Sequence, residues 1–305
     1  MSADHRLKIA FDPCYIHPLP PGHRFPMQKY ELIPLQLLRE GVIEEGNLFV
    51  PGMLDEDDVL RAHTKDYWER LRDLSLDPRE IRRTGFILDR ALVDRESSIV
   101  QGTIESAHNA LEHGLSFNIA GGTHHAGSDW GEGFCLLNDQ AIAAQHLLAI
   151  GLVERILIVD LDVHQGNGTA EIFGTNDRVF TFSVHAEKNF PFRKEKSDLD
   201  IGLNIGIGDE DYLEILEENL IEVLESFHPQ FVFYQSGVDV LQTDKLGHLN
   251  LTMNGCALRD ELVFQLCKMR GIPVQVSMGG GYSAELRFVV QAHCQTFKKG
   301  IEIFF

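Results

Sequence analysis

Short apolar segments of strand length alternate along this chain with longer segments in which apolar residues recur at helical spacing. The pattern predicts seven strands, at residues 7–11, 116–120, 155–162, 179–185, 201–205, 231–235 and 273–278. It predicts four amphipathic helices between them, at residues 96–113, 139–150, 210–227 and 256–270. Gly151 and Gly271 directly follow two of these helices, and glycine at that position is a common helix stop.

Nearly continuous apolar strands joined by helices are typical of a parallel sheet that is covered on both faces. No linker rich in Pro or Ser, low-complexity tract or internal repeat divides the sequence. We therefore expect a single α/β domain over residues 1–305, built on one parallel β-sheet with helices on both faces. In such sheets ligands bind in the crevice beyond the carboxyl ends of the strands.

Chemically capable side chains follow or end five of the predicted strands. In chain order they are His124 and His125, then Asp160, Asp162 and His164, then Ser183 and His185, then Asp239, and last Tyr282. Because the carboxyl ends of parallel strands meet at one edge of a sheet, we expect these groups to share one rim. A chance distribution of polar residues would not place such groups at the ends of five strands.

Asp160, Asp162 and His164 alternate along an extended segment, so their side chains point the same way. Carboxylates and an imidazole in one place are costly unless a cation satisfies them, and this donor set suits Zn²⁺ or Fe²⁺. With Asp239 as a third ligand beside Asp162 and His164, a fourth position stays open, as in catalytic zinc sites. Taken alone, the segment is also compatible with a solvated strand end, and Asp239 with a helix cap.

His124 and His125 are candidates for the general base and acid, because a metal-activated water needs a proton acceptor. Asp160 is the natural partner to orient one imidazole, and Asn167 could accept from the other. Tyr282 follows three glycines and could stabilise an oxyanion. The alternatives without a catalytic role are two histidines of the surface or core and an ordinary buried tyrosine.

Phe134, which follows Gly133, and Phe190 are candidate walls of a narrow apolar slot, although isolated aromatic residues usually belong to the core. The sequence contains no G-x-S-x-G, H-E-x-x-H, G-x-x-x-x-G-K-[ST] or G-x-G-x-x-G motif. Serine hydrolases, zincins, P-loop NTPases and dinucleotide-binding proteins are therefore disfavoured.

The chain has 27 Lys and Arg against 46 Asp and Glu, a formal net charge of −19. This charge argues against nucleic-acid or anionic-membrane partners and is compatible with basic protein segments. The five cysteines are scattered without a C-x-x-C pair, which fits a reducing compartment. With no apolar leader at the N-terminus and no apolar run of membrane length, a cytoplasmic protein is expected.

Five segments together resemble the zinc-dependent histone deacetylase family, within the arginase–deacetylase fold. They are residues 121–126, 133–139, 160–168, 236–239 and 279–282, and they occur in family order along most of the chain. The resemblance implies zinc ligands at Asp162, His164 and Asp239. It implies an acid/base pair at His124 and His125, with Asp160 behind the first imidazole and Asn167 behind the second.

The resemblance also implies that Tyr282 polarises the substrate carbonyl, and that Gly133, Phe134 and Phe190 bind the acyl-lysine side chain. Family members hold potassium near the backbone of the zinc ligands, and the resemblance also implies a second monovalent-cation site. The residues implied for potassium are Asp160, Asp162, His164, Ser183 and Val184, with Phe173, Asn176 and Val179 for the second site.

Asn167 and Gln165 depart from the commoner family form, which has Asp and His at these positions. The form seen here resembles the class IV branch and its bacterial relatives, and it leaves one catalytic histidine less strongly polarised. Arginase-like chemistry with two metals would need further carboxylates, but Gly166 and Leu241 stand where they would be expected. A single metal is predicted.

The expected function is metal-dependent hydrolysis that removes acetyl or longer acyl groups from the lysine ε-amine of proteins or peptides, as a linear-amide hydrolase. Long-chain deacylation is plausible by the class IV resemblance. The first alternative is a small-molecule amidohydrolase, for example on acetylpolyamines, and the second is a non-catalytic acyl-lysine-binding protein. A monomer or weak oligomer is expected, and Arg24 either lines the inner end of the pocket or is a surface cation.

Overall fold

A computed structural model describes residues 4–305 of the chain, and its strands form one sheet in the order β2-β1-β3-β8-β7-β4-β5-β6. Every neighbouring pair is parallel. The strands are β1 (Lys8–Ala10), β2 (Leu48–Phe49), β3 (Leu115–Asn118), β4 (Ile156–Asp160), β5 (Val179–Ala186), β6 (Leu199–Leu203), β7 (Phe231–Gln235) and β8 (Val274–Ser277). The expected parallel sheet is confirmed.

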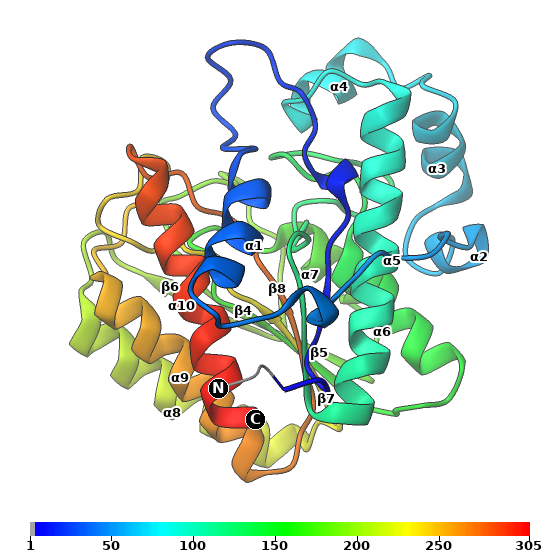
Figure 1. The fold of residues 1–305 in the computed structure, drawn as a ribbon. Coiled ribbons are helices and arrows are strands. Elements are labelled where there is room, and N and C mark those ends of the chain that lie inside the picture. Colours follow the sequence, from blue (N-terminus) through cyan, green and yellow to red (C-terminus); the bar gives the residue numbers. More distant parts are fainter. Residues whose placement is uncertain (1–3) are drawn as a thin grey trace.

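Helices cover both faces of the sheet (Figure 1). One layer contains α1 (Lys29–Arg39), α8 (Asp209–Phe227), α9 (Met253–Met269) and α10 (Leu286–Phe304). The other contains α2 (Glu56–Val59), α3 (Lys65–Arg72), α5 (Arg90–His113) and α6 (Asp139–Ala149). The short helices α4 (Pro78–Thr84) and α7 (Asn167–Phe173) lie toward the carboxyl ends of the strands. No helix within residues 4–305 is long and apolar enough to span a lipid bilayer.

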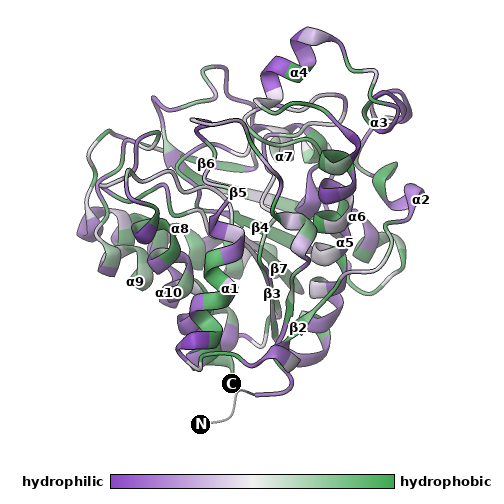
Figure 2. Ribbon diagram, turned by 45° about the horizontal axis from the view of Figure 1, so that its top comes forward, coloured by the Kyte–Doolittle hydropathy of each residue, from purple (hydrophilic) through white to green (hydrophobic). Residues whose placement is uncertain are grey.

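The apolar residues lie where the layers meet. Figure 2 shows hydrophobic strands between helices whose outward faces are largely hydrophilic. Every residue of β3, β4, β7 and β8 is buried, as expected for strands covered on both faces. That the domain extends over residues 1–305 stays a prediction.

The predicted helices and strands all occur, with shifted ends at several of them. Helix α5 begins at Arg90, before the predicted residue 96, because the Asp89 carboxylate caps it by accepting from the Leu92 N–H at 2.8 Å. Helix α9 begins at Met253, because Thr252 Oγ1 accepts from the Gly255 N–H at 3.0 Å. Strand β2 and helices α1–α4, α7 and α10 were not predicted from the sequence.

The strand register brings the carboxyl ends of the central strands level. Asp160, the last residue of β4, pairs with Ser183 of β5 on one side and with Gln235 of β7 on the other. Gln235 in turn pairs with Ser277 at the end of β8. The loops that follow these strands therefore start side by side, and this arrangement positions the site.

A buried ion pair behind these loops holds two of them together. The Arg259 guanidinium on α9 is fully buried and donates to the carbonyl oxygens of Leu161, at 3.1 Å, and Gly237, at 2.6 Å. It pairs with Asp260 at 2.7 Å. Breaking such a pair by removing one partner typically costs about 3–5 kcal/mol, so Arg259 fixes the relative position of the loops after β4 and β7.

The imidazole of His63 links the loop after α2 to the start of α6. Its Nε2 accepts from the backbone N–H of Asn138 at 2.9 Å, and burial lowers its pKa to about 4. The unfolded chain takes up this proton near pH 6.5, and the folded protein only near pH 4. Stability present above pH 6.5 is therefore lost as the pH falls from 6.5 toward 4.

We predict that protonation of His63 lowers the free energy of unfolding by about 1.4 kcal/mol for each pH unit of acidification over this window. His63→Gln keeps an acceptor but cannot take up a proton, so the free energy of unfolding should depend less steeply on pH. Urea unfolding at pH 7, 6 and 5 measures both proteins. Parallel pH dependences for the two proteins would contradict the assignment.

Candidate active site

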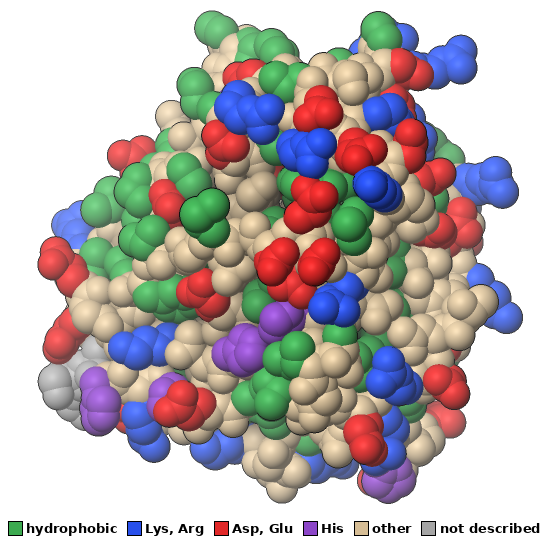
Figure 3. All heavy atoms as spheres, turned by 90° about the vertical axis from the view of Figure 1, so that its right-hand side faces the viewer, with side chains coloured by type: hydrophobic (Ala, Val, Ile, Leu, Met, Phe, Trp, Pro, Cys, Tyr) green, Lys and Arg blue, Asp and Glu red, His purple; other side chains and the backbone are tan. Residues whose placement is uncertain are grey.

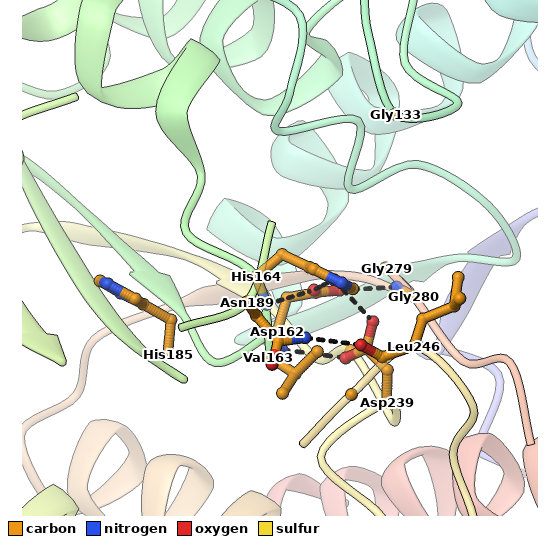
Figure 4. A network of polar contacts seen from close by, with 12 residues as sticks. Gly133, Asp162, Val163, His164, His185, Asn189, Asp239, Leu246, Gly279 and Gly280 are labelled. Atoms are coloured by element: carbon orange, nitrogen blue, oxygen red, sulfur yellow. Dashed lines mark hydrogen bonds and ion pairs between the residues drawn. The ribbon is translucent and has the colours of Figure 1, made fainter. Parts of the chain in front are cut away.

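Asp162, His164 and Asp239 form a buried cluster at the carboxyl ends of β4 and β7 (Figure 4). One ligand atom from each lies within 4.8 Å of the other two. His164 Nδ1 is 3.0 Å from Asp162 Oδ1 and 3.3 Å from Asp239 Oδ2. The structure therefore brings together the three residues predicted as metal ligands, from two separate loops.

The chemistry of this cluster fits a divalent metal. Asp239 Oδ2 is fully buried and has no hydrogen-bond partner within the described residues. Burial, together with the charge of Asp162, raises the pKa of the Asp239 carboxyl to about 7. Although burial opposes it, the Asp162 and Asp239 carboxylates beside the imidazole raise the pKa of His164 to about 10. Protons thus occupy the cluster when no metal does, and two carboxylates with one imidazole suit Zn²⁺.

Backbone groups hold both carboxylates in place. Asp162 Oδ2 accepts from the Gly280 N–H at 2.8 Å, and Asp239 Oδ1 accepts from the Val163 N–H at 2.9 Å. A Cβ atom on Gly280 would collide with the carboxylates of both Asp239 and Asp162. Only glycine therefore fits at this point of the loop after β8, which explains one glycine of the Gly-Gly-Gly-Tyr segment.

His124 and His125 lie beside the cluster with their ring centroids 4.1 Å apart. His124 Nδ1 donates to Asp160 Oδ2 at 2.6 Å, and His125 Nδ1 donates to Asn167 Oδ1 at 2.7 Å. Both predicted pairings are present. The Nε2 atoms are left for chemistry, and that of His124 lies 3.9 Å from Asp162 Oδ1.

The two imidazoles differ in basicity. Burial disfavours the charged form of His124, but the nearby Asp160 and Asp162 carboxylates raise its pKa overall. Burial and the charges of His124 and His164 hold the pKa of His125 well below its usual range. His124 is therefore suited to hold a proton, and His125 to remain neutral and accept one.

Tyr282 is held by Asp244, a residue that the sequence did not single out. Asp244 Oδ2 accepts from the Tyr282 N–H at 2.6 Å, while Oδ1 accepts from two N–H groups of its own loop. Burial and the charges of Asp239 and Asp162 raise the pKa of the Tyr282 hydroxyl well above 10. The hydroxyl thus stays protonated and available as a donor.

Phe134, Phe190 and Tyr282 line an outer cavity of about 530 Å³ that reaches His125 and His164. Gly133 also lines it, and a Cβ there would lie 2.7 Å from the His125 ring and 3.1 Å from Phe190. The residues expected to bind an acyl-lysine side chain thus surround the approach to the cluster.

An inner cavity of about 40 Å³ continues past the cluster and is bordered by Phe25, Tyr30 and Arg95. Behind it the buried Lys29 Nζ donates to the Gly279 carbonyl at 2.7 Å. Burial lowers the pKa of Lys29 to about 8. Arg24 does not reach this inner end. It is exposed and lines the outer cavity. Of its two expected positions, the inner end of the pocket is therefore wrong and the surface position is correct.

The residues implied for potassium fall into two groups. Asp160 and Ser183 are neighbours across β4 and β5, and Ser183 Oγ lies 2.9 Å from His185 Nδ1. His185 points away from the cluster of Asp162, His164 and Asp239 (Figure 4). The second group forms a turn between α7 and β5. In it the Asn176 N–H donates to the Phe173 carbonyl, and the Val179 N–H donates to the Asn176 carbonyl. Both potassium sites stay predictions.

Several residues that support the site were missed by sequence reasoning. Glu132 accepts from Asn167 Nδ2 at 2.7 Å and so orients the partner of His125. Lys29, Asp244 and Arg259 each bond to a segment far away in the chain. Two of these residues carried a signal in the sequence. Lys29 and Arg259 are charged residues on the apolar, buried faces of helices α1 and α9.

A parallel sheet with a buried cluster of two carboxylates and an imidazole, beside a histidine pair, is typical of metal-dependent hydrolases. Comparison with known proteins identifies the family. The histone deacetylase domain matches residues 23–297. The chain therefore belongs to the histone deacetylase family.

Individual relatives agree with this assignment. An uncharacterized protein of Picosynechococcus sp. is 45% identical over 93% of this chain and 95% of its own length. Histone deacetylase 2 of Arabidopsis thaliana is 29% identical over 85% of this chain and 70% of its own length. Human histone deacetylase 1 is 31% identical over 92% of this chain, which spans only 61% of that protein.

The crystal structure of the HDA15 HD domain has the same fold, with a TM-score of 0.82 at 21% identity, covering 99% of this chain and 89% of that one. The deacetylase-type α/β fold expected from the sequence is thus confirmed.

We predict that Zn²⁺ raises the unfolding temperature of the metal-free protein, because the ion binds the native cluster and not the unfolded chain. Asp239→Asn removes one anionic ligand and should abolish most of this shift. Differential scanning calorimetry with and without Zn²⁺ measures it. Asp177→Asn, at an exposed position, is the matched control and should keep the full shift. An undiminished shift in Asp239→Asn would place the metal elsewhere.

Proposed function

We propose that this chain is a zinc-dependent deacylase that removes an acyl group from the ε-amine of lysine in proteins or peptides. The observation that supports it best is the convergence of three elements at the inner end of one cavity. These are the cluster around His164, the histidine pair, and the Tyr282 hydroxyl. Zn²⁺ is the metal proposed, with Fe²⁺ as the alternative.

When bound, the metal would supply Lewis-acid polarisation of the scissile carbonyl and of the attacking water. His125, which is kept neutral, accepts the proton of that water at Nε2. The Tyr282 hydroxyl donates to the oxyanion as the carbonyl carbon becomes tetrahedral. His124, held in its charged form by Asp160, then donates its proton to the departing amine nitrogen. The C–N bond breaks, and a carboxylic acid and a lysine amine leave.

The size of the inner cavity favours short acyl groups. Its volume of about 40 Å³ is small beside the 530 Å³ of the outer cavity, so little room is left beyond the scissile carbonyl. Acetyl-lysine is therefore the proposed substrate, and the octanoyl or myristoyl chains suggested by the class IV resemblance would need this cavity to widen. Membership of class IV, bound potassium, a cytoplasmic location and a monomeric or weakly associated state remain proposals.

We predict that acetyl-lysine peptides are hydrolysed with a higher kcat/KM than octanoyl- or myristoyl-lysine peptides of the same sequence. Side-by-side steady-state assays of the zinc-loaded protein measure the order. Turnover confined to acetylated polyamines would instead support the small-molecule alternative, and binding without turnover would support an acyl-lysine-binding protein.

We also predict that Tyr282→Phe lowers kcat by about 10²–10³-fold, the usual effect of losing one oxyanion donor. The substitution removes only the hydroxyl, so Zn²⁺ binding should be unchanged. Tyr15→Phe removes a buried hydroxyl outside the site and is the matched control. If the Tyr282→Phe protein has the same kcat as the unmodified protein, the proposed oxyanion role of Tyr282 is wrong.

A further inference from the structure

Glu132 lies directly behind the hydrogen-bond partner of His125. Its Oε1 accepts from Asn167 Nδ2 at 2.7 Å, and its Oε2 accepts from Arg83 Nη2 at 2.9 Å. The side chain is only 15% exposed. Asn167 Oδ1 accepts from His125 Nδ1 at 2.7 Å. A carboxylate, an amide and an imidazole are therefore joined in one continuous chain of hydrogen bonds.

This chain determines how the Asn167 amide is oriented. An amide has an acceptor on one side and a donor on the other, and the surrounding hydrogen bonds decide which way it points. The Glu132 carboxylate accepts hydrogen bonds only, so it attracts the NH₂ group and turns the amide oxygen toward His125. Hydrogen bonds in series also polarise one another, which strengthens Asn167 Oδ1 as an acceptor.

We propose that Glu132 is a positioning residue for the general base, acting on His125 through Asn167. His124 is hydrogen-bonded directly to the Asp160 carboxylate. Between His125 and the Glu132 carboxylate stands the amide of Asn167. The negative charge of Glu132 stabilises the imidazolium that forms when His125 takes a proton. The inference rests on the proposed function only in taking His125 as the proton acceptor.

Three variants test this role. Glu132→Ala should lower kcat about tenfold and move the acid limb of the pH profile of kcat/KM to lower pH, because His125 becomes less basic. Asn167→Asp alone should also be impaired, because it sets two carboxylates in contact. In the Glu132→Ala background, however, Asn167→Asp should restore activity by giving His125 a direct carboxylate. Asp129→Ala, at an exposed position three residues away, is the control.

A purely structural role for Glu132 gives a different pattern. The pH profile of Glu132→Ala would keep its limbs, and the double variant would be no better than either single one; that result overturns the proposal. If the unmodified protein hydrolyses no acyl-lysine peptide, the proposed function fails instead. The pKa of His125, measured by NMR, then tests the positioning, with a lower value in Glu132→Ala expected and an unchanged value contradicting it.

A second inference rests on the charge around the outer cavity. Arg24, Arg82, Arg83 and Lys188 line it, and Glu132 is the one acidic residue among its lining residues. Arg83 already pairs with Glu132. Across residues 4–305, no carboxylate lies within 4.0 Å of the other three cations. On a chain with a net charge of −19, the mouth of the site is locally basic.

The basic character continues to one side of the mouth and not to the other. A neighbouring cavity of about 540 Å³ is lined by Arg24 and Lys245 and by no acidic residue. A further cavity shares Arg83, Glu132 and Phe190 with the mouth. Its lining has four acidic residues and two arginines, namely Glu80, Asp129, Glu132, Glu195, Arg83 and Arg193. Figure 3 shows a similar mixture of acidic and basic side chains over the face that carries α2, α5 and α6.

Unpaired cations at a cavity mouth attract anionic groups and raise the rate of encounter with them. We infer that the acyl-lysine substrate carries acidic residues beside the modified lysine. This specifies the substrate class of the proposed function and rests on it. It differs from the basic partner segments with which the overall charge of the chain is compatible.

Peptides that differ only in Asp, Gly or Lys beside acetyl-lysine test the inference. The Asp peptide should have about fivefold higher kcat/KM than the Lys peptide at low salt, and 0.5 M NaCl should remove the difference. Arg24→Glu with Lys188→Glu should reverse the order, whereas Arg39→Glu, on an exposed position at the end of α1, should not.

Equal kcat/KM for the three peptides would contradict the inference while leaving the proposed function intact. If no peptide is hydrolysed, the proposed function fails. Fluorescence anisotropy of the same labelled peptides then measures their dissociation constants, and equal affinities would contradict the inference independently.

Discussion

The structure depends on two carboxylates that are buried facing each other. Asp162 and Asp239 are 1% and 0% exposed, and Asp239 Oδ2 lacks a hydrogen-bond donor within the described residues. Burying such charge is costly unless a cation compensates it. Much of the surrounding architecture serves to hold this unfavourable pair together. Gly280 allows the loop after β8 to donate to Asp162, and Arg259 joins the loops after β4 and β7 from behind.

The same principle explains the unequal histidines. Two adjacent buried imidazoles repel each other when both are protonated, and the structure separates their roles by giving them different partners. Asp160 faces His124 directly, so that imidazole favours its charged form. His125 faces a neutral amide and stays neutral. Glu132 bonds to Asn167 and Asn167 bonds to His125, so in the proposed mechanism the charge of Glu132 acts on His125 only through the amide.

The central site could be predicted from the sequence because its residues directly follow strands. Asp162 follows β4, Asp239 follows β7 and Tyr282 follows β8, so the parallel topology alone brings them to one edge. The pattern of β2 could not be recognised, because two residues carry no periodicity. Helix α10 has clear amphipathic spacing, but no strand follows it, and it was not predicted because the predicted helices were those between strands. Glu132 and Asp244 lie in loops, where neither periodicity nor strand order determines what a side chain will contact.

In the proposed site, two aspartates and one histidine hold a single zinc ion with an open position. Extended X-ray absorption fine structure at the zinc edge, on protein loaded with one equivalent of Zn²⁺, tests it most directly. We expect four or five oxygen and nitrogen ligands at about 2.0–2.2 Å, with multiple scattering from one imidazole and no sulfur. A sulfur ligand at about 2.3 Å, or scattering from several imidazoles, would contradict it.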